Sequence, residues 1–131
     1  MQHQVLSTLN DWRAHARKRW LIMPPLSVEA LAWFTRLLGL VIVLNLFDAI
    51  MTTFWVGLGE ATEANPVMAV LIMESPPLFM IGKLGLACFG VFILEKYREN
   101  RLSWAAVIGA NLVYVGIALY HVSYLYLRSL A

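Results

Sequence analysis

The feature that most constrains this chain is a largely apolar run over residues 37–56 that contains one carboxylate. An α-helix needs about 20 such residues to cross roughly 30 Å of hydrocarbon. Two further apolar runs follow, over residues 78–94 and 104–127. The chain is 60% hydrophobic and 14% charged, whereas a soluble domain is about 25% charged. A chain this short cannot bury so much apolar surface in water. We therefore predict an all-α, helical integral membrane protein.

The predicted organisation is an N-terminal segment, residues 1–23, followed by a membrane domain, residues 27–127. In the segment, Trp12 and Trp20 lie away from the basic residues on a helical wheel, which predicts an amphipathic interfacial helix. A solvated tail is the alternative. The predicted transmembrane helices cover about residues 34–57, 78–97 and 103–127. Asn65 and Pro66 predict a short half-helix over about residues 66–74, because they are favoured at the N-cap and the first helical position.

The basic residues are distributed unevenly along the chain. The loop over residues 57–77 carries three glutamates and no lysine or arginine, whereas the turn over residues 96–101 is basic. The positive-inside rule then predicts an inner (cytoplasmic) membrane protein with a cytoplasmic N-terminus and an outside C-terminus. Only Arg128 opposes this orientation. No basic patch that would follow a nucleic acid is present elsewhere. The membrane-surface basic residues, which also suit lipid headgroups, are Arg13, Arg17, Lys18 and Arg19.

Several polar residues fall at one predicted depth in the membrane. A carboxylate such as Asp48 inside a span costs at least roughly 2.5–3.5 kcal/mol on insertion scales, so it must face protein or water. Lys83, within the second span, lies at a similar depth. We predict one outer-leaflet cluster, either an Asp48–Lys83 ion pair that fixes helix register or a ligand site. Its members are Asn45, Asp48, Thr52, Glu63, Asn65, Lys83 and His121.

Familiar catalytic patterns are missing from the sequence. There is no Gly-x-Ser-x-Gly, no His-Glu-x-x-His, no P-loop and no dinucleotide fingerprint. The one cysteine, Cys88, lies in an apolar run and is interpreted as a small buried hydrophobe. His121 is interpreted as a hydrogen-bonding side chain rather than a ligand. We accordingly predict no catalytic residue, no metal and no cofactor, and an enzyme is not favoured.

Small residues mark the second and third predicted spans. Because they let membrane helices approach closely, we expect them at helix contacts. Three helices bury little of one another, so we also expect a homo-oligomer or other membrane subunits as partners, besides the lipid bilayer. These residues are Gly82, Gly85 and Gly90 in the second span, and Ala105, Gly109 and Gly116 in the third.

The spacing Asn45-x-x-Asp48-x-x-x-Thr52, followed by Gly59, a Glu-x-Asn-Pro element at residues 63–66 and Lys83, resembles a family of small prokaryotic multi-pass membrane proteins of unknown function. The resemblance covers residues 37–94. It implies a compact helical membrane fold and no particular reaction. The basic N-terminal segment lies outside it.

Three functions remain open from the sequence. The first is a non-catalytic accessory or scaffold subunit of a larger membrane complex, in which the polar cluster fixes helix packing. The second is a homo-oligomeric ion or proton channel or transporter that uses Asp48, Glu63 and Lys83. The third is an intramembrane metal site or enzyme that uses Asp48, Glu63 and His121.

Overall fold

The computed structural model describes residues 23 and 25–130, which contain four α-helices and no β-strand. The helices are α2 (Val28–Gly57), α3 (Pro66–Glu74), α4 (Pro76–Lys96) and α5 (Arg101–Ser129). Of these, α2, α4 and α5 are long and apolar enough to cross a membrane. The all-α membrane class is therefore confirmed. The interfacial helix predicted over residues 1–23, with Arg13, Arg17, Lys18 and Arg19, lies outside the described residues except for Met23.

Polar side chains set where the helices begin. Ser27, Asn65 and Asn100 are the N-caps of α2, α3 and α5, and each accepts a hydrogen bond from a backbone N–H in the first turn. The cap at Ser27 places the start of α2 at Val28, ahead of the predicted transmembrane part at about residues 34–57, so this helix is longer than a span requires. Pro66 occupies the first turn of α3, where its missing N–H costs nothing.

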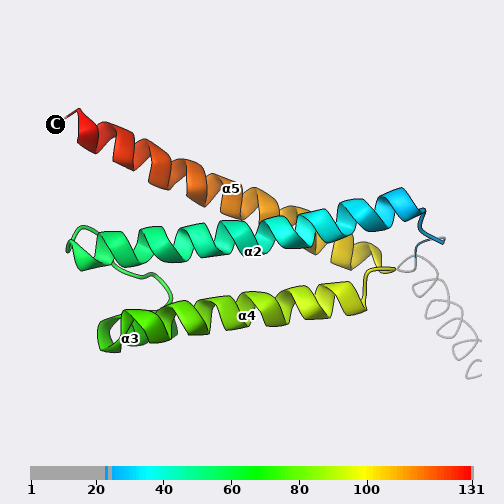
Figure 1. Ribbon diagram of the computed structural model, residues 1–131, viewed down its shortest axis with the longest axis horizontal. Helices are drawn as coiled ribbons and strands as arrows, with labels where there is room; N and C mark the ends of the chain where they lie inside the picture. Colours follow the sequence, from blue (N-terminus) through cyan, green and yellow to red (C-terminus); the bar gives the residue numbers. More distant parts are fainter. Residues whose placement is uncertain (1–22, 24, 131) are drawn as a thin grey trace, which may run out of the picture.

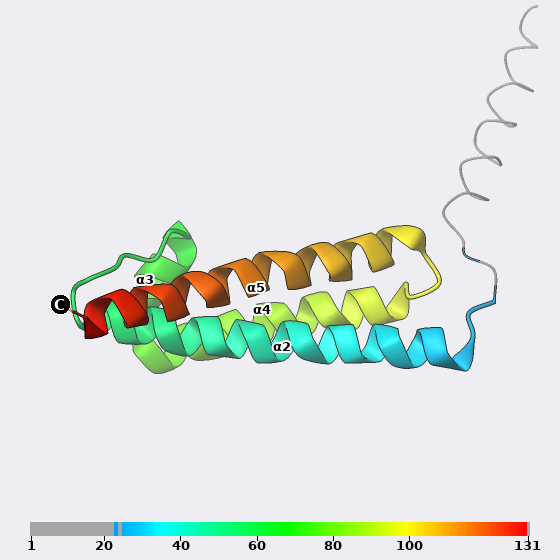
Figure 2. The ribbon, with the colours of Figure 1, turned by 90° about the horizontal axis from the view of Figure 1, so that it is seen from above.

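The three long helices form an antiparallel bundle with α2 at its centre (Figure 1). Helix α2 packs against both α4 and α5, whereas α4 and α5 touch little and diverge toward the C-terminus. Helix α3 packs beside the first half of α4, at the end of the bundle where α2 and α5 finish (Figure 2). Two apolar clusters fill the contacts: Phe34, Leu38, Val41 and Val107 at one end, and Ala49, Met68, Ile72 and Phe79 at the other.

The predicted contacts of the small residues are largely wrong within one chain. A Cβ built on Gly82 would lie 3.1 Å from Leu71 of α3, so this glycine does allow a close approach. At Gly85, Gly90, Gly109 and Gly116, no described atom of a neighbouring element lies within 4 Å. The helices are joined by larger side chains and by polar contacts. Within α4, only Phe79 is buried.

Cys88 also differs from its prediction, because it is exposed on α4. The pattern of apolar residues there does not show which face of the helix meets protein. In a membrane helix all faces are apolar, so the usual amphipathic signal of burial is missing.

Candidate functional site

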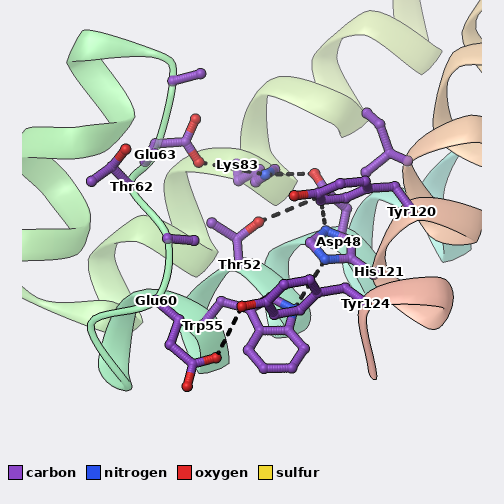
Figure 3. Close-up of a pocket in the computed structure, with 13 residues that line it drawn as sticks. Asp48, Thr52, Trp55, Glu60, Thr62, Glu63, Lys83, Tyr120, His121 and Tyr124 are labelled. Atoms are coloured by element: carbon purple, nitrogen blue, oxygen red, sulfur yellow. Dashed lines mark hydrogen bonds and ion pairs between the residues drawn. The ribbon is translucent and has the colours of Figure 1, made fainter. Parts of the chain in front are cut away.

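Asp48 of α2 is the centre of a polar cluster between the helices (Figure 3). Its carboxylate is buried, and its Oδ2 lies 2.6 Å from the Nζ of Lys83 on α4. Its Oδ1 accepts a hydrogen bond at 3.4 Å from the hydroxyl of Thr52, one turn later on α2. The same Oδ1 lies 3.1 Å from the Nε2 of His121 on α5. One carboxylate therefore joins all three spanning helices.

Glu63 connects the loop between α2 and α3 to this cluster. Its Oε1 accepts a hydrogen bond at 2.9 Å from the backbone N–H of Asn65, the N-cap of α3. Its Oε2 lies 3.9 Å from the Nζ of Lys83. The Asn65 side chain in turn accepts a hydrogen bond from Val67. The Glu-x-Asn-Pro element therefore starts α3 and orients a second carboxylate toward Lys83. Gly59, with a φ of +73°, makes the turn that begins this loop.

The hydrogen bonds of His121 define its tautomer. The indole Nε1–H of Trp55 can only donate, and it lies 3.2 Å from the Nδ1 of His121. Nδ1 must accept this bond, so the ring proton is on Nε2 and is donated to Asp48. Both ring nitrogens of His121 thus have partners within the cluster. Trp55 is 3% exposed and takes part in the site.

Asn45 lies one turn before Asp48 on α2 and contacts a different partner. Its Nδ2 donates a hydrogen bond at 2.6 Å to the hydroxyl of Tyr114 on α5. Its Oδ1 is buried and has no hydrogen-bond partner among the described residues. Asn45 belongs to a second cavity of about 270 Å³ that the Lys83–Glu63 pair separates from the cluster. This cavity is lined by Asn45, Glu63, Asn65, Met68, Lys83, Leu86, Ala87 and Tyr114.

A larger cavity of about 310 Å³, here called the main cavity, lies between the cluster and the loop. Three carboxylates and one ammonium group line it, so its formal charge is negative with His121 neutral. Aromatic rings from α2 and α5 form another part of its wall (Figure 3). The full lining is Asp48, Thr52, Trp55, Glu60, Ala61, Thr62, Glu63, Ala64, Lys83, Ile117, Tyr120, His121 and Tyr124.

Three residues meet at the loop side of the main cavity. Glu60 accepts a hydrogen bond at 3.4 Å from the hydroxyl of Tyr124 and forms an ion pair with Arg128. The Arg128 guanidinium also lies 5.8 Å from the centre of the Trp55 ring. Arg128, the one basic residue that opposed the predicted orientation, is therefore paired locally with a loop carboxylate.

The structure thus places the seven predicted cluster residues in two adjoining groups. Asp48, Thr52, Glu63, Lys83 and His121 lie around the main cavity, whereas Asn45 and Asn65 lie around the second cavity. Three residues around the main cavity, Trp55, Glu60 and Tyr124, were not predicted as members of the cluster. Their positions in the sequence, near the ends of two spans and in the loop, place them close to the predicted depth of the cluster and could have indicated this role.

The geometry does not favour a metal centre. Among the described residues, no group of three histidine, cysteine or carboxylate side chains could hold a metal ion. The ligands that a metal would need from Asp48 and His121 are engaged with each other. What the cluster can do chemically is hold opposite charges in a small, partly apolar space.

No curated protein and no solved structure matches the chain. A family model described as a domain of unknown function, DUF5658, matches residues 39–127. The matched region includes the whole of the polar cluster and extends beyond residues 37–94 to most of α5. The chain therefore belongs to the DUF5658 family, whose function is unknown.

Proposed function

We propose that this protein is a non-catalytic subunit of a larger assembly in the membrane. The observation that carries this proposal is the surface of α4. Of its 21 residues only Phe79 is buried, although α4 bears Lys83, the basic partner of Asp48. Gly85 and Gly90 have open space beside them within the described chain. Small residues beside open space suit close packing against another membrane helix.

The polar cluster supports this function because it fixes how the helices pack against one another. Lys83 holds α4 to α2, His121 holds α5 to α2, and Glu63 holds the loop to Lys83. An ion pair in a membrane can fix helix register because any slip leaves a charge without a partner in an apolar medium. A scaffold subunit needs that fixed register to present α4 to its partner.

The test is to purify the tagged chain gently from its native membranes and weigh the intact assembly by native mass spectrometry. We expect a mass above that of one chain, with a stoichiometric partner. Gly85→Leu should release the partner and leave the helical circular dichroism spectrum unchanged, because a Cβ built at this position meets no described atom in the single chain. Leu119→Phe on α5, which enlarges a side chain that is already large at a position 65% exposed, is the control. A single chain as the only species would refute the proposal.

A second candidate function, ion transport by a homo-oligomer, is favoured by the negatively charged main cavity. Within one chain, however, the polar residues do not extend through the whole length of the bundle. Beyond Asn45 and Tyr114, the bundle is filled by Phe34, Leu38, Val41 and Val107. One copy therefore has no polar pore in the part that the structure describes, so transport requires several copies or an alternating conformation.

Flux of protons and sodium ions into proteoliposomes tests this second function. Asp48→Asn should abolish flux and leave assembly intact, because the cluster loses its central charge. Glu95→Gln, in an exposed ion pair with Arg98 at the opposite end, is the control. Equal flux in the wild-type protein and Asp48→Asn would eliminate this function.

We also propose an orientation in the inner membrane, with the N-terminus in the cytoplasm. The cluster end of the bundle carries the glutamates of the loop, and its basic residue Arg128 is paired with Glu60. The opposite end contains Lys96, Arg98 and Arg101. This charge difference supports a cytoplasmic location for the turn between α4 and α5.

A further inference from the structure

One wall of the main cavity is made of aromatic rings. The Trp55 and Tyr124 rings are 4.8 Å apart and nearly perpendicular, with 87° between their planes. Tyr120 stacks beside Tyr124 at 6.5 Å, with 20° between the planes. Figure 3 shows the Tyr120 and Tyr124 side chains extending from α5 with their hydroxyl groups toward the loop. The faces of such rings attract cations, most strongly when the cation is removed from water.

The rest of the wall favours positive charge as well. Asp48, Glu60 and Glu63 line the cavity, against the single ammonium of Lys83. Lys83 is held between Asp48 and Glu63, so it is not free to meet an anion. A ligand that enters the cavity meets aromatic faces on one side and carboxylates on the other.

A cation of this chain already contacts two residues that line the cavity. The Arg128 guanidinium pairs with Glu60 and lies over the Trp55 ring, 5.8 Å from its centre. Its side chain is 47% exposed, so it can swing away without crossing packed side chains. Arg128 thus contacts both kinds of group that bind cations, an aromatic ring and a carboxylate.

The size and chemistry of the cavity indicate the class of ligand. Its volume of about 310 Å³ is at the small end of ligand sites, which span roughly 300–1,000 Å³. The described residues contain no group of three histidine, cysteine or carboxylate side chains that could hold a metal ion. Alkylated ammonium groups, in contrast, are bound by aromatic rings with nearby carboxylates.

We propose that the main cavity binds a small organic ammonium ion and that Arg128 is the internal competitor that this ion displaces. The ammonium group is either that of a free solute or that of a lipid headgroup. The proposal goes beyond the subunit function and does not depend on it, because it concerns a cavity within one chain. If the transport function holds, the same ion is its substrate.

The experiment measures binding of choline to the full chain in phosphatidylglycerol nanodiscs by isothermal titration calorimetry. The neutral isostere 3,3-dimethylbutan-1-ol, which has the same shape without the charge, is the matched ligand control. We expect saturable choline binding and at least tenfold weaker binding of the alcohol. No saturable choline binding to the folded chain, or equal binding of the alcohol, would overturn the proposal.

Single substitutions distinguish an effect on choline binding from an effect on folding. Tyr120→Leu removes one ring of the wall at an exposed position and should weaken choline binding several-fold. Trp33→Leu is the matched control, because Trp33 is exposed at the opposite end of α2 with Arg36 over its ring. Arg128→Gln should tighten binding several-fold, a gain that misfolding cannot produce. Unchanged or weaker binding in Arg128→Gln would overturn the competition.

The source of the ammonium group is distinguished by the lipid. If the natural ligand is a headgroup, replacing half of the phosphatidylglycerol with phosphatidylcholine should abolish the binding of free choline. If it is a free solute, choline should bind equally in both nanodiscs. Because these measurements need no partner and no flux, their failure is distinguishable from failure of the proposed subunit function.

Discussion

At the end of the bundle where α2 begins, Phe34, Leu38 and Val107 pack against one another without a buried charge. At the other end, Asp48 contacts Lys83 and His121, and Glu63 faces Lys83. We refer to these as the apolar half and the charged half. The same helices thus associate in one half by apolar packing, which costs nothing to insert into lipid, and in the other by charges that are expensive there. In the apolar half, α2 and α5 associate by apolar packing and one hydrogen bond from Asn111 to Leu37, without a charge in the cluster, so the charges in the other half can serve a further purpose.

The charged half orders segments that the apolar half does not reach. The loop over residues 58–65 and the start of α3 depend on Glu63, which bonds the N-cap residue of α3 and faces Lys83. This loop forms one side of the main cavity. The charged network therefore does more than hold the helices together. Through Glu63 it also holds the loop that forms one wall of the main cavity.

The largest effect should follow removal of the central carboxylate. Asp48→Ala leaves Lys83 without its closest partner in a buried position, and breaking such a pair costs about 3–5 kcal/mol. The free energy of unfolding, measured by titrating maltoside micelles with dodecyl sulfate, should fall by that amount. Asp48→Ala combined with Lys83→Met should recover part of it, because the buried ammonium is then absent and only the Glu63 carboxylate has lost its partner. A loss below about 1 kcal/mol, typical of exposed pairs, would remove the distinction between the halves.

A smaller effect is expected from the apolar half. Phe34 is fully buried against Val107 and Trp104, whose ring centre lies 4.9 Å from that of Phe34. Phe34→Ala should lower the free energy of unfolding by about 2 kcal/mol, less than the 3–5 kcal/mol of water-soluble cores, because lipid already solvates apolar side chains. Phe92→Ala, at a position 64% exposed on α4, should change little. A larger loss for Phe34→Ala than for Asp48→Ala would reverse the comparison.

The spans and the half-helix follow from the sequence because their signals are local. Run length predicts a span, and an asparagine before a proline predicts the start of α3. The proximity of Asp48, Lys83 and His121 also follows in part, since a rise of about 1.5 Å per residue fixes depth along each helix. A charge at that depth requires a partner.

The remaining contacts depend on how each helix is rotated, which an all-apolar helix does not encode in its pattern. The bond from Trp55 to His121 was therefore not predicted. The same uncertainty made Gly85 and Gly116 look like contact residues, although each has open space beside it in the described chain. Depth and rotation are thus separate problems, and only depth can be predicted from run length.

The smallest effect is expected from a hydrogen bond inside the apolar half. Asn111 is buried, and its Nδ2 donates to the carbonyl oxygens of Val107 on its own helix and of Leu37 on α2. Interhelical hydrogen bonds in membranes average about 0.6 kcal/mol and reach at most about 1.7 kcal/mol. Asn111→Leu should therefore lower the free energy of unfolding by about 0.6 kcal/mol in the same detergent titration. A loss near that of Asp48→Ala would mean that the apolar half also depends on a polar contact, and the contrast between the halves would then be one of charge alone.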